Sequence, residues 1–541
     1  MAENNGNGNT NNSYVNKATI IIAIFSILAK VLGLVRDAVF SNRFGTSTVM
    51  DSYFAAFRIP DFIFNLLILG TFSVAFIPVF SEYLIKDRKK AYELASSILN
   101  FTLFLILALT LFAFIFIEPL ITIIAPGLHG EARELTKTFT KIFLLSPVFL
   151  TVSSIVSSIL NAEKKFGLVA ASPVVYNLSI IFGAIVFYPM FGPKGLAWGV
   201  VLGSALHLLV QIPQLLRTGF RYTRSLDYHD PLFIKFWKLY WPRIFSMGTS
   251  QVTLLIATFF GSFLGTGALS SFYYSNNLQS VFLSVFAVSF AMAVFPLLSD
   301  LFNKGDESSF KDVVAKTTNQ ILFFIIPLST LMLVLRAQVV RLVLGIGAGT
   351  SFSFEDVRLV ALSLGLFSVS LFAQALIPLY NRAFYARHNT VTPMVISMIT
   401  IVINVVVTYF AVHMFGVPGM ALAFSVTSIL ELVFLIMELH KRLDNMRDEY
   451  LLLNILKIVI ASICGAIVTY VGLYAVAPLV NMQTYWGVLI QGGTSGIIGL
   501  AAYLLTAWLL KIDDSDHMIR LLKSVMVKAG KPFTLIFSFW N

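Results

Sequence analysis

The sequence contains few charged residues and a single cysteine. Asp, Glu, Lys and Arg make up 12% of its 541 residues, whereas they make up about a quarter of a typical soluble domain. This low share excludes a soluble protein. The lone Cys464 excludes an intramolecular disulfide framework, and its position in an apolar run indicates a packing role.

Motifs for nucleotide-driven or metal-dependent chemistry are also missing. The sequence has no phosphate-binding glycine loop, and its seven His do not have metal-ligand spacing. An ATP-driven pump is therefore not expected, and neither is an enzyme. We expect no cofactor and no metal site, with a coupling ion or the membrane potential as a possible energy source.

Long apolar runs dominate the chain instead. Hydrophobic residues make up 57% of the sequence and the mean hydropathy is +0.84, which is typical of a polytopic membrane protein. We predict an all-α fold with fourteen membrane-spanning helices of roughly 20 residues or more. Their approximate cores are 18–42, 52–83, 94–124, 138–161, 168–190, 195–215, 236–263, 268–299, 317–345, 357–385, 391–414, 418–439, 453–478 and 485–510.

The distribution of basic residues predicts the orientation of these helices. With the N-terminus in the cytoplasm, most Lys and Arg outside the spans fall on the cytoplasmic side, as the positive-inside rule requires. The net charge of +11 is then a topology signal and not a sign of nucleic-acid binding. Both termini are predicted to be cytoplasmic, and no cleavable signal peptide precedes the first span.

An internal repeat organises the helices. Gly45-Thr46 and Tyr53-Phe54 recur as Gly265-Thr266 and Tyr273-Tyr274, and Asn161 and Pro173 recur as Asn381 and Pro393. Six predicted helices separate the copies, so both enter the membrane in the same direction, with a pseudo-two-fold axis along the membrane normal. Two such lobes with a site between them are the usual plan of a secondary transporter.

This repeat sets the predicted domain boundaries. The two lobes come first, and helices 13 and 14 lie outside the repeat. We expect the segment between the lobes to be a solvated tether that touches lipid headgroups, and the basic, amphipathic C-terminal tail to lie on the inner leaflet. The predicted segments are a disordered tail at 1–17, the N-lobe at 18–217, a cytoplasmic linker at 218–232, the C-lobe at 233–440, helices 13 and 14 at 441–510, and the tail at 511–541.

Charged residues inside the spans cluster in the first lobe. They are Lys30, Arg36 and Asp37 on the first helix, with Asp51, Arg58 and Asp61 on the second. A charge in a span is costly unless it faces protein or water, so each is a candidate for function. Three cations on adjacent helices suit an anionic headgroup such as a phosphate. The alternative is a set of internal ion pairs that brace the lobe, which applies above all to the three Asp residues.

The second lobe carries amides at the position where the repeat places a cation. Arg58 corresponds to Asn276, which is followed by Asn277. These amides could hydrogen-bond the sugars of a substrate, whereas buried amides in spans more often link neighbouring helices. Both interpretations stay open for Asn276 and Asn277.

Several motifs together resemble the lipid II flippases, also called MurJ or MviN proteins, of the MOP exporter superfamily. The resemblance covers about residues 18–510. The motifs are Ala29-Lys30-Val31-Leu32-Gly33-Leu34-Val35-Arg36-Asp37, Arg43-Phe44-Gly45, Asp51-Ser52-Tyr53-Phe54-Ala55-Ala56-Phe57-Arg58-Ile59-Pro60, Ala125-Pro126-Gly127, Phe295-Pro296-Leu297-Leu298-Ser299 and Arg382-Ala383-Phe384-Tyr385-Ala386.

The resemblance implies a function and a set of site residues. It implies that the protein moves lipid II, an undecaprenyl-diphosphate-linked peptidoglycan precursor, from the inner to the outer leaflet of the bacterial cytoplasmic membrane by alternating access. Lys30 and Arg36 match essential cations of the family, and Asp51 and Arg58 match charged positions. Helices 13 and 14 are implied to form a groove for the lipid tail. Cell-wall synthesis or division proteins are possible partners, and no nucleic acid is expected.

Three departures from the family pattern keep alternatives open. A family arginine is replaced near Phe64-Asn65, the family's Asp-Arg pair reads Asn276-Asn277, and a polar position of helix 7 reads Ala257. One alternative is an exporter of another polyprenyl-linked glycan. A second is a non-transporting membrane scaffold with the same fold. Three cations still suffice to compensate a diphosphate in a low dielectric, which favours lipid II.

Overall fold

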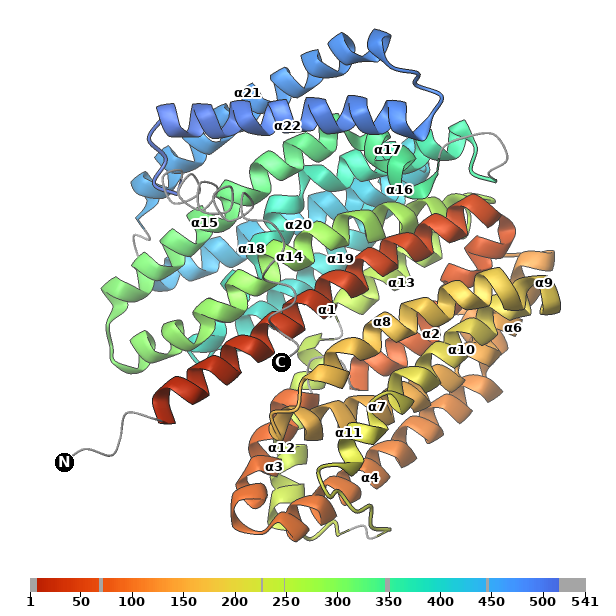
Figure 1. Ribbon diagram of the computed structural model, residues 1–541, viewed down its shortest axis with the longest axis vertical. Coiled ribbons are helices and arrows are strands. Elements are labelled where there is room, and N and C mark those ends of the chain that lie inside the picture. The colour runs from red at the N-terminus through yellow and green to blue at the C-terminus, as the bar shows by residue number, and fades with distance from the viewer. Residues whose placement is uncertain are drawn as a thin grey trace. The chain divides into compact units, whose positions relative to one another are not determined.

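The computed structural model describes residues 7–67, 72–224, 227–247, 249–345, 351–443 and 447–514. These residues form helices and the segments that connect them, without a strand (Figure 1). The helices up to the middle of the chain are α1 (Asn7–Phe44), α2 (Thr48–Leu67), α3 (Phe72–Lys86), α4 (Arg88–Ile115), α5 (Ile117–Ile124), α6 (Gly130–Phe143), α7 (Leu145–Ala162), α8 (Gly167–Phe182), the π-helix η1 (Gly183–Phe187), α9 (Tyr188–Phe191), α10 (Lys194–Leu209), α11 (Ile212–Leu216), α12 (Pro231–Met247) and α13 (Thr249–Gly261).

The remaining helices are longer on average and continue to residue 509. They are α14 (Ala268–Asn303), α15 (Glu307–Val334), α16 (Arg336–Leu344), α17 (Phe354–Val369), α18 (Leu371–Ala386), α19 (Val391–Phe415), α20 (Val417–Leu443), α21 (Asp448–Val476), the 3-10 helix η2 (Ala477–Leu479) and α22 (Tyr485–Leu509). α1 begins within the segment 1–17 that was predicted as a disordered tail. The predicted C-terminal tail lies outside the described residues from 515 onward.

The prediction of an all-α, multi-pass membrane protein is confirmed. Within the described ranges, nine helical segments are long and apolar enough to cross a membrane, and α17 and α18 together could form a tenth span. The charge-rich α2 is not among the nine, because its 20 residues include Asp51, Arg58 and Asp61. The count of fourteen spans therefore stays a prediction.

The structure groups the helices into two compact units. Unit 1 comprises residues 1–278, 343–363 and 397–424, and unit 2 comprises residues 279–342, 364–396 and 425–541. The boundaries between them fall within α14, α16, α17, α19 and α20. This grouping differs from the predicted six-plus-six division, which stays a prediction.

Unit 1 includes α12, the first half of the predicted seventh span. α12 packs against α3 and α4 of the first repeat, where Phe236 and Tyr240 join Phe72 in a buried aromatic cluster. Lys235 also forms an ion pair with Glu82 at 2.9 Å. Burial of these rings supplies the apolar contacts that hold α12 to the first repeat.

The linker between the repeats is not a free tether, because hydrogen bonds hold it on α4, although side chains such as Arg221 stay exposed. The carbonyl oxygen of Thr218 accepts hydrogen bonds from the Tyr92 hydroxyl at 2.9 Å and from Arg88 Nη2 at 3.1 Å. Further along, the backbone N–H of Thr223 donates to Ser96 and that of Asp227 donates to Ser97, both at 3.2 Å. The expectation of a tether was wrong because α4 presents a row of polar side chains that satisfies the backbone groups of the linker.

Unit 2 is built around α15, α18 and the pair α21 and α22. α21 and α22 lie side by side (Figure 1), and Gly465 and Gly499 let their backbones approach closely. The Tyr503 hydroxyl of α22 donates to the carbonyl oxygen of Phe323 on α15 at 2.7 Å. These contacts fix the last two helices on α15.

Candidate functional site

The charged residues of the first repeat lie on two helices joined by a tight turn. α1 ends at Phe44 and α2 begins at Thr48, with Gly45 between them at φ +60°. An L side chain rarely adopts this backbone conformation, so glycine allows the chain to reverse here. The Tyr274 hydroxyl of α14 donates to the Gly45 carbonyl oxygen at 3.3 Å. The turn therefore brings the charged stretches of α1 and α2 against α14 within unit 1.

Arg36 and Asp37 of α1 form an ion pair. Arg36 donates to Asp37 Oδ1 from Nε at 3.0 Å and from Nη2 at 2.8 Å, and its Nη1 donates to Asn177 Oδ1 of α8 at 3.4 Å. The Asp37 side chain is 3% exposed, whereas 23% of the Arg36 side chain is accessible. Asn277 of α14 donates from Nδ2 to Asp37 Oδ2 at 3.0 Å. Arg36 is thus held on one side by protein and reachable on another.

Arg58 of α2 lies in a second ion pair. Its Nη2 donates to Asp61 Oδ2 at 3.4 Å and its Nε donates to the Phe54 carbonyl oxygen at 3.2 Å. Its guanidinium carbon lies 4.5 Å from the centre of the Tyr273 ring, which is a cation–π contact. Nη1 makes no hydrogen bond to any residue that the structure describes. Because a guanidinium has five N–H donors, Arg58 keeps donor capacity for a further acceptor.

Asp51 binds the beginning of α14. Its Oδ2 accepts the backbone N–H of Gly267 at 2.5 Å, and its Oδ1 accepts the backbone N–H and the hydroxyl of Ser270 at 2.8 Å and 2.7 Å. A carboxylate at a helix N-terminus satisfies N–H groups that lack partners within the helix. Asp51 is 3% exposed. Its contacts are with protein, so the predicted substrate contact of Asp51 stays a prediction that this geometry does not support.

The remaining predicted residues differ in their surroundings. Lys30 is exposed on α1, and Asn276 is half-buried on α14 next to Asn277. Of the seven residues predicted to bind substrate, unit 1 contains all, and α14 contacts three of them through Ser270, Tyr273 and Asn277. Ser270 and Asn177 were not predicted. Tyr273 was noticed as part of the repeat and of the Tyr273-Tyr274 match to the family, but its contact with Arg58 was not predicted.

Other contacts link the turn between α1 and α2 with residues of the second repeat. The backbone N–H of Ser351 donates to the Asn42 carbonyl oxygen at 2.9 Å, and Thr46 hydrogen-bonds to Asp356. The backbone N–H of Gly127 donates to the Ser262 hydroxyl at 3.0 Å. With the Asp51 contacts, these bonds join the two repeats.

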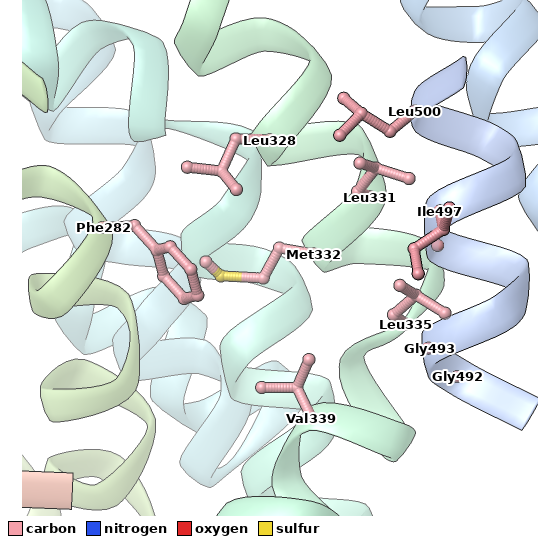
Figure 2. A pocket seen from close by; sticks show the side chains of 11 residues that line it. Phe282, Leu328, Leu331, Met332, Leu335, Val339, Gly492, Gly493, Ile497 and Leu500 are labelled. Carbon is pink, nitrogen blue, oxygen red and sulfur yellow. The ribbon is translucent and has the colours of Figure 1, made fainter. Parts of the chain in front are cut away.

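Unit 2 contains an apolar pocket of about 290 Å³ between helices (Figure 2). Phe282 of α14 and Met332 of α15 lie on one side of it, and Ile497 and Leu500 of α22 lie on another. Gly493 also lines the pocket, and a Cβ at this position would have no heavy atom within 4 Å. The lining residues are Phe282, Leu328, Leu331, Met332, Leu335, Val339, Gly492, Gly493, Gly496, Ile497 and Leu500. A pocket of this composition suits a hydrocarbon ligand.

Comparison with known proteins decides the family. A family model described as "Lipid II flippase MurJ" matches residues 40–489. The chain belongs to the lipid II flippase MurJ family. A probable lipid II flippase MurJ of Buchnera aphidicola (strain APS) is 29% identical over 479 residues, which cover 87% of this chain and 91% of that protein.

Solved structures agree with this assignment. A lipid II flippase MurJ in an inward closed conformation has a TM-score of 0.76 and 26% identity, covering 91% of this chain and 99% of the solved chain. A multidrug resistance MATE family transporter of the MOP superfamily has a TM-score of 0.64 at 15% identity, covering 80% of this chain and 99% of that one. The second likeness shows the fold alone. The predicted MurJ family and MOP superfamily fold are confirmed, and the protein is a member of a transporter family and not an enzyme.

Among the residues that the structure describes, no group of three or more His, Cys, Asp or Glu could hold a metal ion. The charged groups of α1 and α2 instead form ion pairs and hydrogen bonds with one another and with α14.

Replacing Asp51 by alanine should destabilise the protein by about 1–2 kcal/mol, because three donors at the beginning of α14 lose their acceptor. Ser270→Ala should have a smaller effect, since the two backbone bonds to Asp51 persist. Thermal unfolding of the detergent-solubilised variants measures the difference. An Asp51→Ala melting temperature equal to that of the wild type would contradict the capping role.

Proposed function

We propose that this protein translocates lipid II from the inner to the outer leaflet of the bacterial cytoplasmic membrane by alternating access. The observation that carries the proposal is the pair Arg36 and Arg58 on adjacent charged helices of a MurJ family chain. Both arginines are fixed by protein contacts and keep N–H donors for an anion, with 23% of the Arg36 side chain and 10% of the Arg58 side chain accessible. The names of the relatives support lipid II as the substrate.

The chemistry required is recognition of a diphosphate. Arg36 is paired with Asp37 and Arg58 with Asp61, so each of these two pairs is neutral overall, and Lys30 is exposed on α1. Guanidinium donors still bind phosphate oxygens through charge-assisted hydrogen bonds, even where each guanidinium also contacts a carboxylate. Lys30, Arg36 and Arg58 would therefore share the diphosphate.

The lipid tail requires an apolar surface. The pocket between α14, α15, α16 and α22 is lined only by apolar side chains and glycines. We assign one part of the undecaprenyl chain to this pocket. The tail groove was predicted on helices 13 and 14, and α22, which corresponds to helix 14, is one of the helices that line the pocket. Each methylene group buried there would contribute about 0.8 kcal/mol relative to water.

Alternating access requires contacts that break on one side of the membrane. In the predicted topology, the turn between α1 and α2 lies on the outer side. The bonds of Asp51 to α14, of Asn42 to Ser351 and of Gly127 to Ser262 join the two repeats there. Their separation would open an outward path, and their formation would close it. Both termini are cytoplasmic in this proposal, and the membrane potential or a coupled ion resets the cycle.

One observation favours a second candidate substrate. The family's Asp-Arg pair is Asn276-Asn277 here, and the Asn277 amide is used to hold Asp37. The second repeat thus adds no cation at this position, which would suit another polyprenyl-linked glycan whose headgroup makes fewer ionic contacts.

Cell-wall synthesis or division proteins are proposed as partners on the basis of function only.

Replacing Arg36 by alanine should abolish complementation of a flippase-depleted strain, because the diphosphate loses a cation with directed donors. Arg36→Lys should retain part of the activity, since it keeps the charge and loses the planar geometry. Arg221→Ala is the matched control, because Arg221 is an exposed arginine of the linker. Full growth with Arg36→Ala at normal expression would refute the assignment, and would favour the scaffold alternative.

Replacing Gly493 by phenylalanine should fill the apolar pocket without a clash, because a Cβ there meets open space. Excluding roughly two methylene groups of the tail costs about 1.6 kcal/mol, so the KM for undecaprenyl lipid II should rise about tenfold. A short-chain lipid II analogue should be unaffected. Gly493→Ala is the control, since it adds a small side chain that leaves the pocket open. Equal KM values for Gly493→Phe and Gly493→Ala would contradict tail binding in this pocket.

A further inference from the structure

One face of α14 contacts the charged groups of both α1 and α2. Ser270, Tyr273 and Asn277 are spaced by three and four residues, so their side chains project from the same side of the helix. Ser270 contacts Asp51, Tyr273 contacts Arg58, and Asn277 contacts Asp37. All of these residues belong to unit 1. The second repeat thus contacts the charges of the first with neutral side chains.

The Tyr273 ring is held in a single orientation. Its hydroxyl group lies 2.6 Å from the Thr258 hydroxyl and donates to the Leu254 carbonyl oxygen at 3.2 Å. One ring face stacks with Phe54, with centroids 5.2 Å apart, and the side chain is buried. A ring fixed in this way presents a rigid, electron-rich surface to the Arg58 guanidinium. Nothing in this arrangement requires Tyr273 to touch a substrate.

Asn277 acts on Arg36 through Asp37. The two oxygens of the Asp37 carboxylate have different partners. Oδ1 accepts both hydrogen bonds from Arg36, and Oδ2 accepts the hydrogen bond from the Asn277 amide. With Oδ2 bound to Asn277, both Arg36 bonds go to Oδ1, and Arg36 does not form the two-oxygen, fork-like pair that an arginine and a carboxylate prefer. Arg36 therefore keeps its Nη1 group directed toward Asn177 and away from Asp37. The Asn277 amide therefore influences how many N–H donors of the Arg36 guanidinium stay available for another anion.

We propose that Tyr273 and Asn277 are positioning residues for the anion site, so that the second repeat supplies orientation to Arg58 and Arg36 in place of a charge of its own. This inference rests on the proposed function, since it takes the two arginines to bind the diphosphate. It also links anion affinity to the contact between α14 and the first two helices. When α14 moves away, Asp37 pairs fully with Arg36 and Arg58 loses its aromatic face, so the diphosphate is released as that side opens.

The test measures lipid II binding and transport by the purified full chain in lipid nanodiscs and vesicles. Tyr273→Leu removes the ring, whereas Tyr273→Phe keeps the ring and loses only the hydroxyl. We expect Tyr273→Leu to weaken lipid II binding about tenfold and Tyr273→Phe to stay within about twofold of the wild type. Thr258→Val removes a hydroxyl partner of Tyr273 and serves as the control for the stability effect of that bond.

A double-mutant cycle tests the role of Asn277. Asn277→Ala should raise the KM about fivefold with the maximal rate and melting temperature nearly unchanged, because the Asn277 amide bond to Asp37 is lost. The same change in an Asp37→Asn background should have little further effect. Equal binding by Tyr273→Phe and Tyr273→Leu, or additive effects of Asn277→Ala and Asp37→Asn, would overturn the inference.

The proposed function and the positioning role are contradicted by different results. If wild-type protein binds no lipid II, or if Arg36→Ala binds it normally, the proposed function is wrong. If the wild type binds lipid II and Arg36→Ala does not, while the Tyr273 and Asn277 variants change only the melting temperature, the function stands and the positioning role is wrong.

Discussion

Buried charge in a membrane-spanning bundle is stable only where protein groups replace water, and α14 provides many of those groups in this protein. The carboxylate of Asp51 is satisfied by the beginning of α14, Arg58 is contacted one turn further on by Tyr273, and Asp37 two turns further on by Asn277. An isolated charge at these positions would cost several kcal/mol. The first two helices can therefore keep their polar residues only while α14 lies against them or another hydrophilic group takes its place.

The same constraint connects stability with transport. A diphosphate headgroup is itself a hydrophilic group that can satisfy guanidinium donors, so substrate and α14 provide complementary contacts to the same two helices. The bonds at the turn between α1 and α2 and the bond between Gly127 and Ser262 also join the repeats, and these bonds are not ion pairs. An arrangement with several moderate bonds in place of one strong ion pair is suited to opening and closing, since each bond contributes about 1 kcal/mol net.

The fold class and the charged residues could be predicted from the sequence because they depend on local features. Apolar runs identify membrane helices, and Lys30, Arg36 and Arg58 are conspicuous because each interrupts such a run. Their partners could not be predicted in the same way. Asp51 meets Gly267 and Ser270 from more than 200 positions away, and a repeat pattern aligns equivalent residues without saying which of them touch. The contacts of the linker and of α12 could not be predicted for a related reason, since polar and aromatic side chains on α3 and α4 decide where they pack.

Translocation of labelled lipid II by the purified protein in vesicles tests the central claim most directly. The labelled headgroup should reach the opposite leaflet much faster in vesicles that contain the protein than in protein-free vesicles, and faster than an unrelated polyprenyl-diphosphate sugar. Equal rates with and without protein, or transport of the unrelated lipid alone, would contradict the claim.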